Sequence, residues 1–258
     1  MKFLIPLYLL LFYFGPAFGQ NSSNTAELLI QKVLDKVGNQ KYLQIRTIVS
    51  EGNFTLFRDG TPYRTDKFLD VIVLPNREIT EFKSSGERII QANIADKGWF
   101  ADFSRNILRD QTDDELSNFK KSMRTSLYNL LMGYWKLEKA TLSHIGKRPG
   151  DIGKRNDVVK LSYPDGFEVE FEISDQNLPV KVIYKTKNKE GKEIIEYDRY
   201  AQFVEIQGIL TPLIIDHYQN DVPTWRVNYI NVTYNKTIPE TIFQKPRNLK
   251  EIKKDLKI

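Results

Sequence analysis

Residues 167–173 read FEVEFEI, and this stretch shows most clearly how the chain folds. Four apolar side chains alternate with three glutamates along it. Because successive side chains of a β-strand point to opposite faces of the sheet, the alternation predicts a strand with one buried and one solvated face. The glutamates are therefore interpreted as the solvated face of a sheet rather than as catalytic carboxylates.

Similar strands are predicted along most of the chain. Runs rich in β-branched and aromatic residues are separated by short turns, such as Asp59-Gly60. The predicted strands cover residues 44–57, 63–74, 78–82, 88–95, 134–143, 157–163, 167–173, 180–186, 193–204, 209–218 and 225–234. Consecutive strands joined by short turns imply a mainly β fold: an antiparallel meander of about eleven strands that curls round a helix.

The N-terminal segment, residues 1–19, has the pattern of a secretory signal peptide. Lys2 precedes an apolar run, and Ala17 and Gly19 supply the small side chains that a signal peptidase reads. The run is too short and wrongly flanked for a membrane-spanning helix. We therefore expect cleavage before Gln20 and export to the periplasm.

Two helices are predicted within the β pattern. For the first, Asn24 is the expected N-cap, with Glu27 completing a capping box, and Gly38 marks its end. The second opens at Thr112 with another capping box and ends before Gly133. Its apolar positions recur at three- and four-residue steps and form one face: Leu116, Phe119, Met123, Leu127 and Leu130.

Residues that carry enzyme chemistry are sparse. The chain has no cysteine, which excludes thiolate metal sites, cysteine nucleophiles and lipid attachment to the chain itself. His144 and His217 stand far apart and outside any metal-ligand spacing, and no nucleophile elbow, phosphate-binding loop or dinucleotide motif occurs. We therefore predict a protein that is not an enzyme and holds neither a metal nor a cofactor.

The formal net charge is +5, and basic residues are spread thinly except in the C-terminal tail, residues 244–258. This tail is interpreted as a solvated segment, with a weak contact to an acidic partner or an anionic membrane surface as the alternative. No nucleic-acid partner is expected for an exported chain.

The inward faces of the predicted strands carry many large side chains. They include Trp99, Phe103, Phe167, Phe171, Val182, Tyr184 and Phe203. A curved sheet can fill its concavity with such side chains, or leave part of it open for an apolar ligand. The second helix is a plug in the first case and a lid in the second, and periodicity alone leaves both open.

The order of these elements resembles that of LolA-type outer-membrane lipoprotein carriers. A signal peptide, a helix and a long hairpin are followed by LPNREITEF at residues 74–82, ADKGWFADF at residues 95–103, and a further helix. The segment IPETIFQKP at residues 238–246 is similar to the closing segment of that family. The resemblance lies in the order of the motifs and covers most of the chain.

The resemblance implies an incomplete antiparallel β-barrel, lidded by helices, that forms a single lipid-carrier domain over residues 20–243. It implies a monomer that carries the acyl chains of a lipoprotein or lipid across the periplasm in a hydrophobic cavity, for transfer to the outer membrane. An inner-membrane transporter and an outer-membrane acceptor are the implied partners. Trp99 follows the family's Asp-Gly-Lys-type turn and is thereby placed on the cavity wall.

One position departs from the family pattern. Where such carriers have a basic residue tied to cargo transfer, this chain has Leu74, and Arg77 lies just beyond. A sensing or interaction module on the same scaffold, binding lipid or an envelope protein without transporting it, is therefore an alternative function. A filled barrel with a structural role is a third.

Overall fold

The computed structural model describes residues 17–188, 190–252 and 256, with side chains from residue 22 onward. Within this part of the chain, thirteen strands form one antiparallel sheet. The strands are β1 (Thr47–Arg58), β2 (Thr61–Val73), β3 (Arg77–Ser84), β4 (Glu87–Ile94), β5 (Lys97–Asp102), β6 (Ile107–Asp110), β7 (Thr141–Pro149), β8 (Arg155–Ser162), β9 (Glu168–Ile173), β10 (Pro179–Lys187), β11 (Glu193–Ile206), β12 (Ile209–Gln219) and β13 (Val222–Tyr234).

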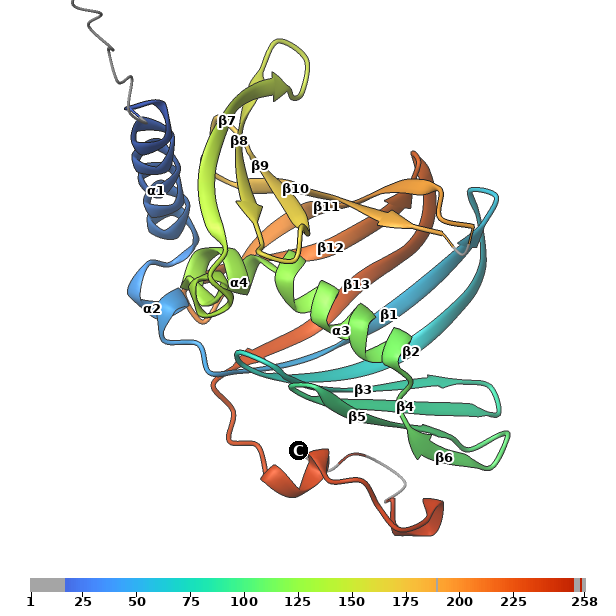
Figure 1. Ribbon diagram of the computed structural model, residues 1–258. Coiled ribbons are helices and arrows are strands. Elements are labelled where there is room, and N and C mark those ends of the chain that lie inside the picture. The colour runs from blue at the N-terminus through green and yellow to red at the C-terminus, as the bar shows by residue number, and fades with distance from the viewer. Residues whose placement is uncertain (1–16, 189, 253–255, 257–258) are drawn as a thin grey trace, which may run out of the picture.

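The sheet runs in the order β6-β5-β4-β3-β2-β1-β13-β12-β11-β10-β9-β8-β7. Each half is a meander, and the two halves are joined where β1 pairs with β13. The sheet curves into an open half-barrel whose edges are β6 and β7 (Figure 1). The predicted incomplete β-barrel is thereby confirmed.

Helices cover the sheet in two places. The helices are α1 (Ala17–Val37), α2 (Gln40–Leu43), α3 (Asp113–Thr125), α4 (Leu127–Met132) and the 3-10 helices η1 (Tyr134–Glu138), η2 (Glu240–Phe243) and η3 (Leu249–Glu251). Figure 1 shows α3 lying across the concave face of the sheet and α1 beside β7. The C-terminal segment with η2 packs against the opposite face, at β3 and β4. Among the described residues, no helix combines the length and apolar character needed to cross a membrane.

Several sequence predictions need correction. The sheet has thirteen strands rather than about eleven, because a hairpin through residues 97–110 adds β5 and β6. Residues 134–138 form η1 instead of the start of a strand, because the left-handed Gly133 lets the chain turn again directly after α4. Asn24 is not an N-cap, since α1 already begins at Ala17 and a cap satisfies N–H groups only where a helix begins. Nearly all of the predicted signal peptide lies outside the described residues.

The second predicted helix begins as expected but is divided in two. Thr112 and Glu115 form the expected capping box, with the Thr112 backbone N–H donating to Glu115 Oε2 at 2.8 Å. Ser126 has an extended backbone between α3 and α4. Its hydroxyl donates to the Met123 carbonyl at 2.8 Å and accepts from the Asn129 N–H at 3.1 Å. One serine therefore satisfies groups at the end of α3 and at the start of α4.

Thr112→Ala is expected to lower the free energy of unfolding by about 1 kcal/mol, because the Glu115 N–H loses its acceptor. Urea denaturation measures the change. Ser117→Ala, on the exposed side of the same helix, is the control and is expected to change stability by no more than about 0.5 kcal/mol. Equal losses for the two variants would contradict a capping role for Thr112.

Two hydrophobic cores lie on opposite faces of the sheet. The larger core joins α1, α4 and η1 to β7–β10, with Phe171 and Leu161 fully enclosed. The smaller core joins β2–β5 to the C-terminal segment through Phe243. Leu249 and Ile252, which belong to the predicted solvated tail, pack against this smaller core. The described part of the tail is therefore anchored by its apolar residues, which the count of basic residues did not reveal.

Candidate functional site

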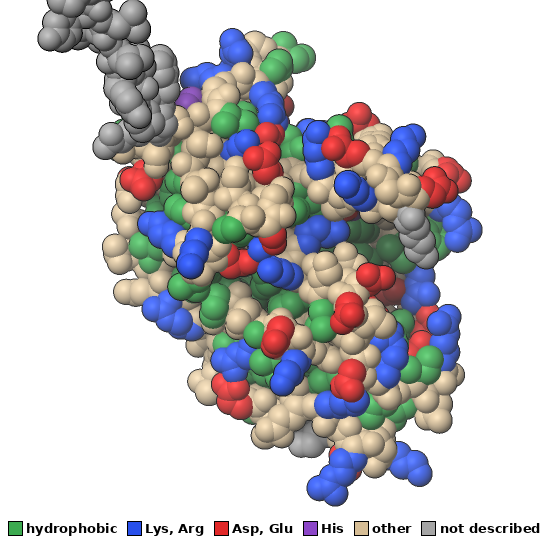
Figure 2. Space-filling view, in the orientation of Figure 1, with side chains coloured by type: hydrophobic (Ala, Val, Ile, Leu, Met, Phe, Trp, Pro, Cys, Tyr) green, Lys and Arg blue, Asp and Glu red, His purple; other side chains and the backbone are tan. Residues whose placement is uncertain are grey.

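A cavity of about 310 Å³ lies between the concave face of the sheet and the helices α3 and α4. Strands β1–β3 supply one wall, β10–β13 supply the other, and Met123 and Leu127 lie on the helical side. Most of the lining is aliphatic or aromatic. The described structure thus leaves part of the concave face unfilled. In Figure 2, apolar side chains show in the hollow of this face, and charges of both signs are interspersed around it.

A bulge in β1 shapes the floor of the cavity. The register of β1 with β13 shifts between Glu51 and Gly52, and Gly52 lies opposite Tyr229. A Cβ atom at Gly52 would lie 2.0 Å from the Asn228 carbonyl oxygen, so only glycine allows this close approach of the two strands. Tyr229 lines the cavity and packs edge-on against Phe68, with 5.7 Å between ring centroids.

An outer groove of about 520 Å³ adjoins the cavity on the other side of the helices. Four residues line both spaces and therefore form the partition between them: Leu74, Met123, Ser126 and Tyr128. The thioether of Met123 is unbranched and flexible, and such side chains repack easily around ligands.

Ion pairs hold α3 over the cavity. The buried Arg124 guanidinium donates to Glu138 at 2.6 Å and to Asp165 at 2.8 Å. One turn earlier, the Lys121 ammonium lies 3.7 Å from Glu196 on β11. Charged contacts therefore help to fix the position of α3, in which Phe119 is the one buried apolar side chain. By contrast, α4 places both Leu130 and Leu131 in the larger core.

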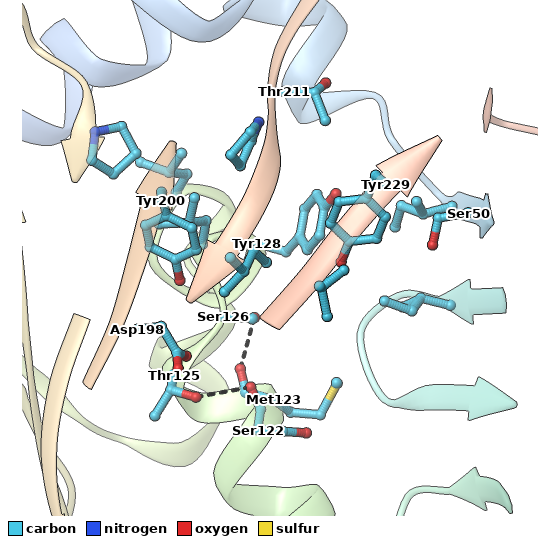
Figure 3. A pocket seen from close by; sticks show the side chains of 18 of the residues that line it. Ser50, Ser122, Met123, Thr125, Ser126, Tyr128, Asp198, Tyr200, Thr211 and Tyr229 are labelled. Atoms are coloured by element: carbon cyan, nitrogen blue, oxygen red, sulfur yellow. Dashed lines mark hydrogen bonds between the residues drawn. The ribbon is translucent and has the colours of Figure 1, made fainter. Parts of the chain in front are cut away.

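Six tyrosines line the cavity and place hydroxyl groups on its largely apolar wall. They are Tyr42, Tyr128, Tyr184, Tyr200, Tyr229 and Tyr234. Figure 3 shows the rings of Tyr128, Tyr200 and Tyr229 along the wall. Burial raises the pKa of these three phenols, so all three are neutral at ordinary pH. Each ring offers apolar surface together with one hydroxyl that donates or accepts a hydrogen bond.

A buried charge cluster stands behind the wall at β11 and β12. Asp198 lines the cavity and accepts a hydrogen bond from His217 Nδ1 at 2.6 Å, while His217 Nε2 lies 3.3 Å from Glu196. The imidazole stacks on Trp225 with 4.7 Å between centroids. Burial by itself lowers the pKa of His217, but hydrogen bonds to both carboxylates outweigh it and raise that pKa to about 9.

Glu196 completes the cluster with a strongly acidic carboxyl. Burial by itself raises the pKa of Glu196, but hydrogen bonds from His217 and Thr186 outweigh it and lower that pKa to about 2. Sequence reasoning missed this cluster, because Asp198 and His217 become neighbours only through the register of β11 with β12. The alternation of Glu196 and Asp198 along one strand face was the available signal.

The predicted site residues separate into four groups, of which Trp99 and Phe103 form the last. Tyr184, Phe203, Met123 and Leu127 line the cavity. Leu116 and Phe119 line the outer groove. Phe171, Val182 and Leu130 are buried in the larger core, and Phe167 packs against that core.

Trp99 and Phe103 lie away from the cavity, at the smaller core. The Trp99 indole donates to the Phe243 carbonyl at 2.8 Å, and the Arg88 guanidinium lies 4.4 Å from the centre of the Phe103 ring. The C-terminal segment therefore occupies the place beside Trp99 that the sequence analysis assigned to a ligand.

Leu74, at the position where the family has a basic residue, and the nearby Arg77 face opposite sides of the sheet. Leu74 lines both the cavity and the outer groove. Arg77 forms an ion pair with Glu240 and lies over the ring of Phe243 in the C-terminal segment. Arg77 is thus engaged on the face opposite the cavity. Among residues 17–188, 190–252 and 256, no group of His, Asp and Glu side chains has an arrangement that would hold a metal ion.

No family model and no curated protein matches the chain. Among solved structures, a DUF1329 family protein from Desulfovibrio piger is similar with a TM-score of 0.59 at 11% identity, over 85% of this chain and 97% of that one. A LolA superfamily protein from Nitrosomonas europaea is similar with a TM-score of 0.55 at 14% identity, again over 85% and 97% of the two chains. The resemblance inferred from the order of motifs is confirmed at the level of the fold.

Proposed function

Since the chain has the fold of LolA superfamily proteins, we propose that it is a carrier of acyl chains. The observation that supports this most directly is the apolar cavity between the concave sheet and α3, lined by Tyr184, Phe203, Met123 and Leu127. Its volume of about 310 Å³ falls at the lower end of the usual range for small-ligand sites. Each buried CH₂ group of a cargo chain contributes about 0.8 kcal/mol with little directionality.

The cargo is the lipid moiety of a lipoprotein, or a free lipid, on its way to the outer membrane. The signal-peptide pattern of residues 1–19 supports export, which makes the periplasm the place of action. An inner-membrane transporter that loads the carrier and an outer-membrane acceptor that unloads it are the corresponding partners. No chemical step on the cargo is part of this proposal.

Cargo enters from the outer groove through the partition formed by Leu74 and Met123. Movement of α3 widens this opening, and the ion pair of Lys121 with Glu196 is one of the contacts that must break. Since charged contacts regain water when they open, such a movement costs less than exposing an apolar core.

Native mass spectrometry of protein purified from its own host tests the proposal. We expect mass additions that correspond to lipid, and their removal by organic extraction. An apo protein that never takes up acyl chains, even when offered them in excess, would overturn it.

A Met123→Ser, Leu127→Ser double variant is expected to weaken binding of a fluorescent fatty-acid probe by at least about tenfold, because each side chain contributes apolar contact worth roughly 1 kcal/mol or more. Stability should fall only modestly, since neither side chain is fully buried. Ile152→Ser with Ile230→Ser, at two exposed positions, is the matched control and should bind normally. Global unfolding of the double variant would instead indicate that the two residues belong to a filled core.

Leu74 favours a second candidate function: an interaction module that binds lipid or an envelope protein without transporting it. The position that corresponds to the carriers' basic residue is apolar in this chain, and the nearby Arg77 forms an ion pair with Glu240. Genetic depletion separates the two functions. Mislocalised lipoproteins support the carrier, whereas an altered envelope-stress response with correct lipoprotein sorting supports the module.

A further inference from the structure

The floor of the cavity holds a polar side chain without a partner. Ser50 is only 3% exposed and lines the cavity, yet within the described structure its hydroxyl has no hydrogen bond. Figure 3 shows Ser50 next to Tyr229 on the wall. The hydroxyl is open to the cavity rather than enclosed by protein, so it is free to form a hydrogen bond with a polar group of a ligand.

Two neighbouring carboxyl groups, those of Asp70 and Glu78, lie near Ser50, and Glu78 lines the cavity. Asp70 lies directly opposite Ser50 on β2 and opposite Thr80 on β3, whose hydroxyl donates to Asp70 at 2.7 Å. Glu78 is two residues before Thr80, so it points to the same face of the sheet, and it lines the cavity. Within the described residues, no hydrogen bond reaches the Glu78 carboxyl group.

No basic side chain balances these carboxyl groups. Among the described residues that line the cavity, Lys121 is the one cation, and it pairs with Glu196 on β11. Burial raises the pKa of Asp70 to about 6, and burial with the neighbouring Asp70 raises the pKa of Glu78 well above its usual value. The pair therefore lacks a positive partner that would hold both groups ionised.

A protonated amine fits this set of groups. An ammonium group has three donors and no acceptor. The Glu78 carboxyl group, the Ser50 hydroxyl and the Tyr229 hydroxyl offer acceptor oxygens on the cavity wall, and within the described residues no hydrogen bond to any of the three is present. An ammonium group beside Glu78 supplies the missing cation and favours the ionised form of that carboxyl group. An anionic head group would instead add negative charge to a buried site that has no cation beside it.

We propose that the cavity selects amphiphiles whose polar end is a protonated amine, with Glu78, Ser50 and Tyr229 holding the amine and the alkyl chain extending toward Met123. This inference rests on the proposed function, because it assigns the polar end of the same acyl-chain site. An aminophospholipid and a lipopeptide with a free α-amino group both carry this chemistry.

Titration calorimetry with dodecylamine, dodecanol and dodecanoate, each below its micellar concentration at pH 7, tests the selectivity. We expect wild-type protein to bind dodecylamine at least about tenfold more tightly than dodecanoate, with dodecanol between them. Glu78→Gln should remove most of this preference and leave dodecanol binding unchanged. Glu51→Gln, an exposed position next to Ser50 on the same strand, is the matched control and should keep the preference.

Ser50→Ala gives a second measurement that does not depend on the folding of the Glu78 variant. It should weaken dodecylamine binding about threefold and leave dodecanoate unaffected. Equal binding of the amine and the carboxylate by wild-type protein, or an amine preference that survives Glu78→Gln, would overturn the inference while leaving the carrier proposal intact. Failure of all three ligands to bind would overturn the carrier proposal itself. Separate titrations with an aminophospholipid and with the lipopeptide then identify the natural source.

Discussion

Phe171→Ala is expected to lower the free energy of unfolding by about 3–5 kcal/mol, one of the two largest effects we predict for a single substitution in this chain. Phe171 is 0% exposed on β9, between Val159 on β8 and Val182 on β10. Both neighbours are fully buried as well, so the strands have little freedom to collapse into the space left by the ring. Denaturation in urea or guanidinium, followed by tryptophan fluorescence, measures the loss.

Phe203→Ala provides the contrast that separates core from cavity. Phe203 is one of the same set of inward aromatic residues, but it lines an existing space and is only partly buried. Its removal enlarges that space without opening a new one, so we expect a loss of about 1 kcal/mol and a weaker affinity for acyl chains. If Phe203→Ala costs as much stability as Phe171→Ala, the concave face is filled and the carrier proposal loses its main support.

His217→Phe is expected to lower the free energy of unfolding by about 3–5 kcal/mol at pH 7. The phenyl ring preserves the stacking on Trp225 but leaves Asp198 and Glu196 buried together without their shared cation. His144→Phe is the matched control. His144 pairs with Asp157 at 3.0 Å in a partly exposed position, where such a pair contributes no more than about 1 kcal/mol.

The advantage of wild-type protein over His217→Phe should depend on pH in a defined direction. The pKa of His217 is raised from 6.5 to about 9 by folding, so the folded state binds this proton more tightly than the unfolded state. The stability that it contributes is fully present below about pH 6.5 and is lost as the pH rises through about 9. Unfolding free energies of both proteins, measured from pH 6 to pH 10, give the difference directly. A difference that stays constant over this range would show that His217 is not held in its protonated form.

Much of the local structure was predictable from the sequence because it depends on neighbours in the chain. The capping box at Thr112 and the end of the first helix at Gly38 follow from short-range hydrogen bonding and backbone freedom. The strand at residues 168–173 follows from the alternation of its side chains. The division of the second helix at Ser126 was harder to predict, because a serine can also lie inside a helix. Only the structure shows that its hydroxyl bonds to the end of α3 and to the start of α4.

The candidate site was predictable only in part. The inward aromatic residues were identified as a group, yet only Tyr184 and Phe203 of that group line the cavity. The carboxyl group of Glu78 on the cavity wall has no sequence signal, and the alternation of Glu196 and Asp198 is the one signal for the cluster at His217. The members of both groups meet through strand register across distant segments.

The sequence by itself determined that alternate side chains are buried, where most of the strands and helices lie, and in what order these follow one another. Only the tertiary structure decided what each buried face lies against. The face with Trp99 is covered by the chain's own C-terminal segment, and the face with Tyr184 is covered by α3 with a cavity between. The physical reason is that alternation of apolar and polar side chains shows which face of a strand is buried, but not which segment covers that face. In this sheet, different parts of the chain cover the two faces.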